Sequence, residues 1–143
     1  MIRADHPPLI LSGGIPPSHR QQAGDWAAAA EQFKAIAVMA VAVPSPELDA
    51  VLEMNSGFLA MAKNDYEMAE AHFRQVLQYG DNLAAACNVG VCLLYRGSLS
   101  KAIAYYEGLT RPDRHASDTV VLNLNTLYEI ETNNSLKKKS NAV

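Results

Sequence analysis

The side chains of this 143-residue chain that are most typical of zinc sites are four histidines and two cysteines. Cys87 and Cys92 are separated by about 140° around a helix at 100° per residue, so their thiols point to different sides. No Cys-x-x-Cys, His-x-x-x-His or His-Glu-x-x-His spacing occurs, although zinc sites are commonly built on these. We therefore expect no metal and no cofactor, and we interpret both cysteines as free thiols that pack as small hydrophobic side chains. The histidines are scattered, at His6, His19, His72 and His115.

Residue patterns typical of catalysis are also missing from the sequence. Ser12-Gly13-Gly14-Ile15 has two glycines but no following Lys-Ser/Thr pair, so it does not match a phosphate-binding loop. Asp65, Glu67 and Glu70 gather at the start of one predicted helix, where carboxylates stabilise the helix dipole. Without a nucleophile next to a base or a working pair of carboxylates, we expect no catalytic residue, no enzymatic activity and no small-molecule substrate.

The composition argues against two further classes of protein. The chain carries 12 basic and 15 acidic residues and has a pI of about 5.7, whereas nucleic-acid-binding domains usually have a pI above about 9. The longest apolar run, from Ala35 to Val43, is less than half of the roughly twenty residues that a membrane span needs. The first residues lack the apolar core of a signal peptide. We therefore expect no nucleic-acid partner and no membrane span.

Prolines and glycines divide the chain into two parts. Four of the seven prolines lie in the first seventeen residues, so we interpret residues 1–22 as a Pro/Gly-rich, disordered lead-in. The remainder, residues 23–143, contains segments of helical length and no strand pattern, which predicts an all-α domain. The expected elements are a helix over 25–43, helical hairpins over 47–79 and 83–110, and a helix over 117–132 that ends at Asn133-Asn134.

A set of small and aromatic residues recurs at a fixed offset. In two consecutive segments a glycine is followed twelve residues later by an alanine and four residues after that by an aromatic residue. The two sets are 33 residues apart, close to the 34-residue period of tetratricopeptide repeats. We therefore predict a tetratricopeptide-like, right-handed helical solenoid of about three helix-turn-helix units. The sets are Gly57, Ala69 and Phe73, and Gly90, Ala102 and Tyr106.

Three asparagines recur at equivalent places in the repeats. In chaperone-binding tetratricopeptide proteins an asparagine here helps to clamp a terminal carboxylate of a partner, together with lysine and arginine on neighbouring positions. The neighbouring positions in this sequence carry no positive charge, so we favour a structural role in which the amides bind loop or helix-end carbonyls between hairpins. The asparagines are Asn55, Asn88 and Asn123.

Apolar residues are more numerous than one buried helix face requires. The segment from Leu83 to Tyr95 contains no charged residue, which is typical of a helix that is covered on all sides. If the superhelix is the usual one, a second apolar stripe lines its inner wall, and such surfaces often bind proteins. Alternatively, the chain's own lead-in or neighbouring repeats fill this groove. The predicted groove residues are Met54, Phe58, Met61, Cys87, Val91, Leu94 and Tyr95.

From Val51 to about Lys139 the sequence resembles the C-terminal end of one family, subunit 12 of the TRAPP (trafficking protein particle) membrane-tethering complex. Residues 1–46 resemble it poorly. Three segments carry the resemblance: Asn88 to Tyr95 with Gly97 and Leu99, Pro112-Asp113-Arg114-His115, and Val121 to Glu131 leading to Lys137-Lys138-Lys139.

The resemblance implies a non-enzymatic scaffold subunit that holds other TRAPP subunits together in vesicle transport from the endoplasmic reticulum to the Golgi. It also implies a cytoplasmic location, peripheral to the membranes of these compartments. The alternative is a free tetratricopeptide adaptor or co-chaperone that captures a peptide. A permanent subunit needs apolar contacts of about 2,000 Å² or more. The predicted apolar groove therefore favours the subunit over the adaptor. We interpret Lys137 to Lys139 as a solvated end of the chain.

Overall fold

The computed structural model describes residues 23–42, 44–110 and 116–142. Within these ranges the chain forms six α-helices and no strand, so the predicted all-α class is confirmed. The lead-in expected over residues 1–22 lies outside the described residues. The helices are α1 (Ala23–Ala42), α2 (Pro46–Ala62), α3 (Tyr66–Tyr79), α4 (Leu83–Tyr95), α5 (Leu99–Leu109) and α6 (Asp118–Asn141).

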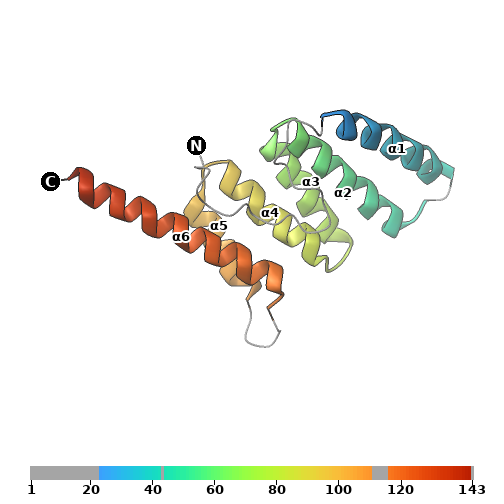
Figure 1. Cartoon of the computed structure of the whole chain (residues 1–143). Helices are drawn as coiled ribbons and strands as arrows, with labels where there is room; N and C mark the ends of the chain where they lie inside the picture. The colour runs from blue at the N-terminus through green and yellow to red at the C-terminus, as the bar shows by residue number, and fades with distance from the viewer. Residues whose placement is uncertain (1–22, 43, 111–115, 143) are drawn as a thin grey trace.

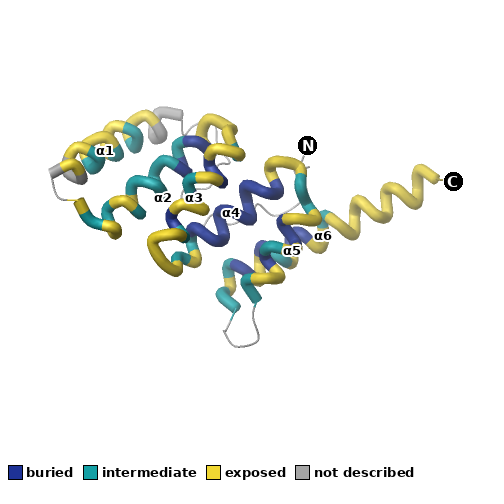
Figure 2. The backbone as a smooth tube through the Cα atoms, turned by 180° about the vertical axis from the view of Figure 1, so that it is seen from behind, coloured by how far each residue is buried: buried dark blue, intermediate teal, exposed yellow. Residues whose placement is uncertain are grey.

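The helices stand in one row in chain order, and each packs chiefly against the next (Figure 1). Helices α2 and α3 form one antiparallel hairpin and α4 and α5 form the next, at the positions predicted for the two hairpins. The arrangement is consistent with a helical solenoid. Burial is greatest in the middle of the row, where α4 is buried from Ala85 to Leu94 (Figure 2).

Local sequence sets where the helices begin and end. Four helices start at a side chain that accepts a hydrogen bond from the backbone N–H three residues further on, which satisfies a donor that the helix leaves free. The turns inside the hairpins use backbone with positive φ, at Asn64 (59°) and Gly97 (81°). Both residue types tolerate this conformation better than others do. The capping residues are Ser45, Asp65, Asn82 and Ser117.

In both hairpins a glycine of the first helix lies directly under an aromatic ring of the second. A Cβ atom at Gly57 would lie 2.6 Å from Cε1 of Phe73, and a Cβ atom at Gly90 would overlap the ring of Tyr106. Both rings are fully buried. The two contacts involve the residues that the 33-residue offset relates, so the sequence repeat corresponds to a repeated packing contact.

Helix α6 continues where the sequence suggested that it stops. The prediction ended this helix at residue 132, but it extends through Asn133 and Asn134 to Asn141, so that prediction was wrong. Asparagine is only modestly unfavourable inside a helix, unlike glycine or proline. Lys138 and Lys139 in the last turn also interact favourably with the negative end of the helix dipole.

Replacement of Gly90 with alanine tests the close contact. Although alanine favours helix by about 1 kcal/mol relative to glycine, we expect Gly90→Ala to lower the free energy of unfolding by about 1–3 kcal/mol because the new methyl group overlaps Tyr106. Gly108→Ala is the matched control, since a Cβ atom there meets no atom within 4 Å. It should raise stability by up to about 1 kcal/mol. Urea denaturation followed by circular dichroism measures both; a Gly90→Ala variant as stable as Gly108→Ala contradicts the prediction.

Candidate interaction surfaces

The predicted groove residues are mostly buried within this chain. Five of the seven belong to the hydrophobic core, so they do not form an open apolar wall within this chain. Met54 is half-buried against the core, and Tyr95 is 37% exposed. Only these two therefore offer a partner side-chain surface without a rearrangement of the helices. The buried five are Phe58, Met61, Cys87, Val91 and Leu94.

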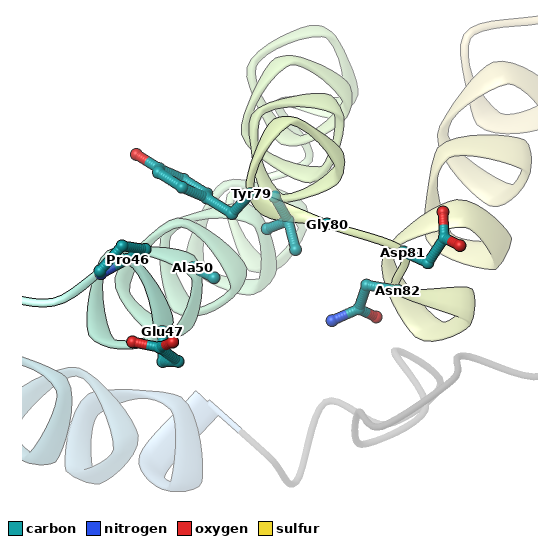
Figure 3. Close-up of a pocket in the computed structure, with 8 residues that line it drawn as sticks. Pro46, Glu47, Ala50, Tyr79, Gly80, Asp81 and Asn82 are labelled. Atoms are coloured by element: carbon teal, nitrogen blue, oxygen red, sulfur yellow. The ribbon is translucent and has the colours of Figure 1, made fainter.

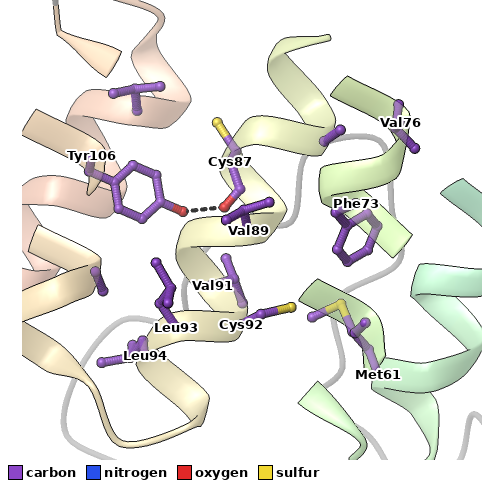
Figure 4. Packing of buried hydrophobic residues seen from close by; sticks show 14 of the residues in the cluster. Met61, Phe73, Val76, Cys87, Val89, Val91, Cys92, Leu93, Leu94 and Tyr106 are labelled. Atoms are coloured by element: carbon purple, nitrogen blue, oxygen red, sulfur yellow. Dashed lines mark hydrogen bonds between the residues drawn. The ribbon is translucent and has the colours of Figure 1, made fainter. Parts of the chain in front are cut away.

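The packing of helix α4 explains why apolar residues that were expected to line a groove are buried instead. It packs against α3 on one side and α5 on the other, so its uncharged surface is core (Figure 4). Periodicity cannot distinguish an apolar stripe that faces a groove from one that faces another part of the same chain. Both cysteines are buried, as expected, and they do not form a disulfide with each other. Burial, reinforced by the nearby Glu70 carboxylate, raises the pKa of Cys92 to about 12, so this thiol stays protonated near neutral pH.

Tyr95 is held in place by a second tyrosine. The rings of Tyr66 at the start of α3 and Tyr95 at the end of α4 are stacked, with centroids 4.8 Å apart and an interplanar angle of 11°. Burial raises the pKa of both hydroxyl groups above the ordinary tyrosine value. The pair therefore presents a rigid, uncharged, partly exposed aromatic surface at the edge where the hairpins turn.

A buried carboxylate connects three helices. Glu70 of α3 is 7% exposed and accepts hydrogen bonds from Arg74 Nε at 2.8 Å and from Arg96, the residue that follows α4. The Arg74 guanidinium also lies 5.6 Å from the ring centroid of Tyr105 on α5. Burial alone would raise the pKa of Glu70, but the hydrogen bonds and charges of the two arginines outweigh it and lower the pKa. Sequence analysis assigned Glu70 only to the helix dipole and missed this network.

A buried hydrogen-bond chain attaches α6 to the second hairpin. Tyr106 donates its hydroxyl proton to the Cys87 carbonyl at 2.6 Å and accepts a hydrogen bond from Asn123 Nδ2 at 3.0 Å. The bond to the carbonyl appears as a dashed line in Figure 4. Asn123 thus links α6 to the second hairpin through the Tyr106 hydroxyl, which is a structural role.

The described residues form an open groove at the edge of the row opposite the hairpin turns. This edge groove, of about 560 Å³, lies between the ends of α3 and α5 and the starts of α4 and α6. Leu83 on its wall is 49% exposed. A smaller hollow of about 160 Å³, between the start of α2 and the end of α3, adjoins it through Asp81 and Asn82 (Figure 3). The apolar lining of the edge groove is Leu77, Leu83, Ala86, Tyr105, Leu109 and Val120, and its polar lining includes Asp81, Asn82 and Ser117.

Sequence reasoning missed the edge groove because four helices contribute to it. The local signal was Leu83, a large apolar residue just after the Gly80-Asp81 break, where polar residues are more usual. Its side chain is 49% exposed. An apolar surface framed by polar groups is the kind of surface on which proteins bind one another.

In the part of the chain that the structure describes, no three His, Cys, Asp or Glu side chains gather closely enough to hold a metal ion. None of the helices described above is both long and apolar enough to cross a lipid bilayer.

The fold is an all-helical row, consistent with a helical solenoid, with candidate protein-binding surfaces, and the comparisons with known proteins agree with the family resemblance. The chain is 31% identical over 121 residues to human trafficking protein particle complex subunit 12, a match that covers 82% of this chain and 16% of the human protein. It is equally similar to the mouse subunit, of which it covers 15%. The predicted resemblance to TRAPP subunit 12 is thus confirmed, and the chain spans about one sixth of the length of these relatives.

The match is longer than the sequence alone suggested. A match over 82% of the chain cannot be confined to residues 51–139, so the similarity extends upstream into α1. No family model and no solved structure matches the chain.

The Glu70 network predicts a specific dependence of stability on pH. Because folding lowers the pKa of Glu70, its contribution is complete above the unfolded-state pKa of about 4.3 and is lost as the pH falls through the lower folded-state pKa. We expect Glu70→Gln to reduce the free energy of unfolding at pH 7 by roughly 1 kcal/mol, and the difference from the parent chain to shrink below about pH 4.

Glu67→Gln is the control, because Glu67 is exposed on the same helix. Urea denaturation at pH 7 and at pH 3 measures both variants against the parent. If Glu70→Gln and Glu67→Gln have equal effects at pH 7, the arginine contacts do not stabilise the fold.

Proposed function

We propose that the chain is a tetratricopeptide-like, right-handed solenoid of about three helix-turn-helix units that acts as a non-enzymatic scaffold. The order of the helices and the Gly–aromatic contact repeated at an offset of 33 residues support the repeat assignment. The terminal α1 and α6 each correspond to half a unit. Such a stack provides long surfaces made from several helices, which suits it to binding other proteins.

The scaffold belongs to a TRAPP-type tethering complex and acts in vesicle transport from the endoplasmic reticulum to the Golgi. The observation that carries this proposal is the similarity to TRAPP subunit 12 over 82% of the chain. Its partners are other subunits of the complex, and its location is cytoplasmic, peripheral to the membranes of the two compartments. Scaffold function requires no cofactor and no small-molecule substrate.

The edge groove is the main surface for a partner subunit. Its apolar lining and polar frame match the anatomy of protein interfaces, in which a few large apolar and aromatic side chains near the centre contribute most of the binding energy. Tyr105 and the exposed Leu83 provide such side chains. Of the groove first predicted from sequence, Met54 and Tyr95 are further contact positions for a partner, whereas Phe58, Met61, Cys87, Val91 and Leu94 are buried in the core of this chain.

Co-purification tests the proposal. We expect the tagged full chain to retain TRAPP subunits from cell extract, and Leu83→Asp to reduce their recovery at least about tenfold, because it places a charge in the apolar groove. Met68→Asp is the matched control. Met68 is also half-exposed in the first turn of a helix, where an aspartate is tolerated, but it does not line the groove.

Quantitative mass spectrometry of the retained proteins, with circular dichroism of each variant, separates the outcomes. Tyr95→Ala tests that further contact position in the same way. Failure of the parent chain to retain any TRAPP subunit contradicts the scaffold assignment. Retention of chaperones or isolated peptides in their place favours the alternative, a free adaptor or co-chaperone. Equal recovery with Leu83→Asp and Met68→Asp places the interface outside the edge groove.

A further inference from the structure

The outward side of α6 carries exposed side chains, of which Tyr128 also donates a hydrogen bond to Glu107 Oε1 of α5. Val121 is 40% exposed, Tyr128 38% and Leu136 58%. These residues share one side of the helix, opposite the buried Val120 and Leu127, and with four further residues on that side they form a series spaced three or four positions apart. At 100° per residue, the whole set falls within about 80° around the helix. We call it the α6 stripe: Asp118, Val121, Asn125, Tyr128, Thr132, Leu136 and Lys139.

The equivalent side of α4 is covered by a helix. The residues 35 positions before Val121, Asn125 and Tyr128 are Ala86, Gly90 and Leu93, and all three are buried where α5 packs on α4. The α6 stripe thus occupies the place at which the preceding helix of this type receives a neighbour. Asn125 stands where Gly90 admits an aromatic ring, so a neighbour of α6 lies at the ordinary helix–helix distance of about 8–10 Å.

The carboxy-terminal part of α6 projects from the row as a fully exposed arm. Every residue from 131 to 142 is exposed, and the arm extends beyond α5 (Figures 1 and 2). Such a short helical segment is marginally stable in water without packing. Among the described residues, no ion pair involves Lys137, Lys138 or Lys139. A neighbour along the arm would therefore stabilise it and neutralise its charge.

We infer that the α6 stripe binds the α6 stripe of a second copy of this chain, with the two helices antiparallel. If two copies of α6 run antiparallel about a centre between Tyr128 and Glu129, residues of matching chemistry lie opposite each other. Asp118 then faces Lys139 of the second copy, Val121 faces Leu136, and Asn125 faces Thr132. An isologous pair makes each of these contacts twice.

The distribution of charge along α6 favours a second copy of this chain as the partner of the α6 stripe and favours antiparallel pairing. The α6 helix has acidic residues in its first turn and middle, at Asp118, Glu129 and Glu131, and basic residues only near its end. Antiparallel pairing brings the basic end of one helix to the acidic start of the other, whereas parallel pairing places the lysines of both copies side by side. The unsupported arm of each copy lies on the supported half of the other.

A charge exchange tests this pairing in the full chain. Sedimentation velocity over a range of concentrations should show a reversible dimer that weakens as the salt concentration rises. Asp118→Lys and Lys139→Glu each convert both end contacts into repulsions, so we expect either variant alone to raise the dimer dissociation constant by about tenfold or more. An equimolar mixture of the two restores both attractions and should dimerise about as tightly as the parent.

An apolar variant provides a test that is independent of the end charges. Leu136→Glu should abolish the dimer, because it places a charge in the stripe on the exposed arm, where no intramolecular contact is lost. Asn134→Glu makes the same charge change about 160° away around the arm and should leave the dimer intact. A parent chain that remains monomeric at every concentration overturns the inference and leaves the stripe to a different protein. A dimer that is unaffected by Leu136→Glu, or by both charge variants, also overturns it.

Discussion

In both hairpins the ring of an aromatic residue on the second helix rests on the backbone of a glycine on the first. The contact exists only because glycine has no Cβ atom, and it brings the two helices close enough for the ring to be fully buried. The remainder of the row depends on it, because the spacing of each hairpin determines where the next one can pack. A repeated array of this kind is stabilised by each unit and by its contacts with neighbours.

The two hairpins carry different side chains at equivalent positions, and these side chains make different contacts with the next helix. The first hairpin has Phe73 over its glycine, whereas the second has Tyr106, whose hydroxyl reaches both the Cys87 carbonyl and Asn123 on α6. A buried polar group is costly unless it is paired, so Tyr106 favours a following helix with an asparagine at this place. Glu70 has a comparable role between α3 and α4, since Arg96 follows the last turn of α4.

The sequence repeat made the positions of the helical hairpins predictable. The residues that lie on the surface and line its grooves were harder to predict. The offset of 33 residues and the breakers located both hairpins, because glycine, alanine and aromatic residues occur where helices must approach closely. The same patterns could not show that Phe58, Val91 and Leu94 face other parts of the chain. They also could not reveal the edge groove or the Glu70 network, whose members come from different helices and have no common spacing in the sequence.

The most direct test of this account is a double-mutant cycle on the first hairpin, between Gly57→Ala and Phe73→Leu, measured by equilibrium urea denaturation. If the ring on the glycine backbone sets the hairpin spacing, Gly57→Ala destabilises the parent chain but has little effect, or stabilises, once the ring has been replaced. The account predicts a coupling free energy of about 1–3 kcal/mol between the two substitutions. Additive effects, with Gly57→Ala equally costly in both backgrounds, would contradict it.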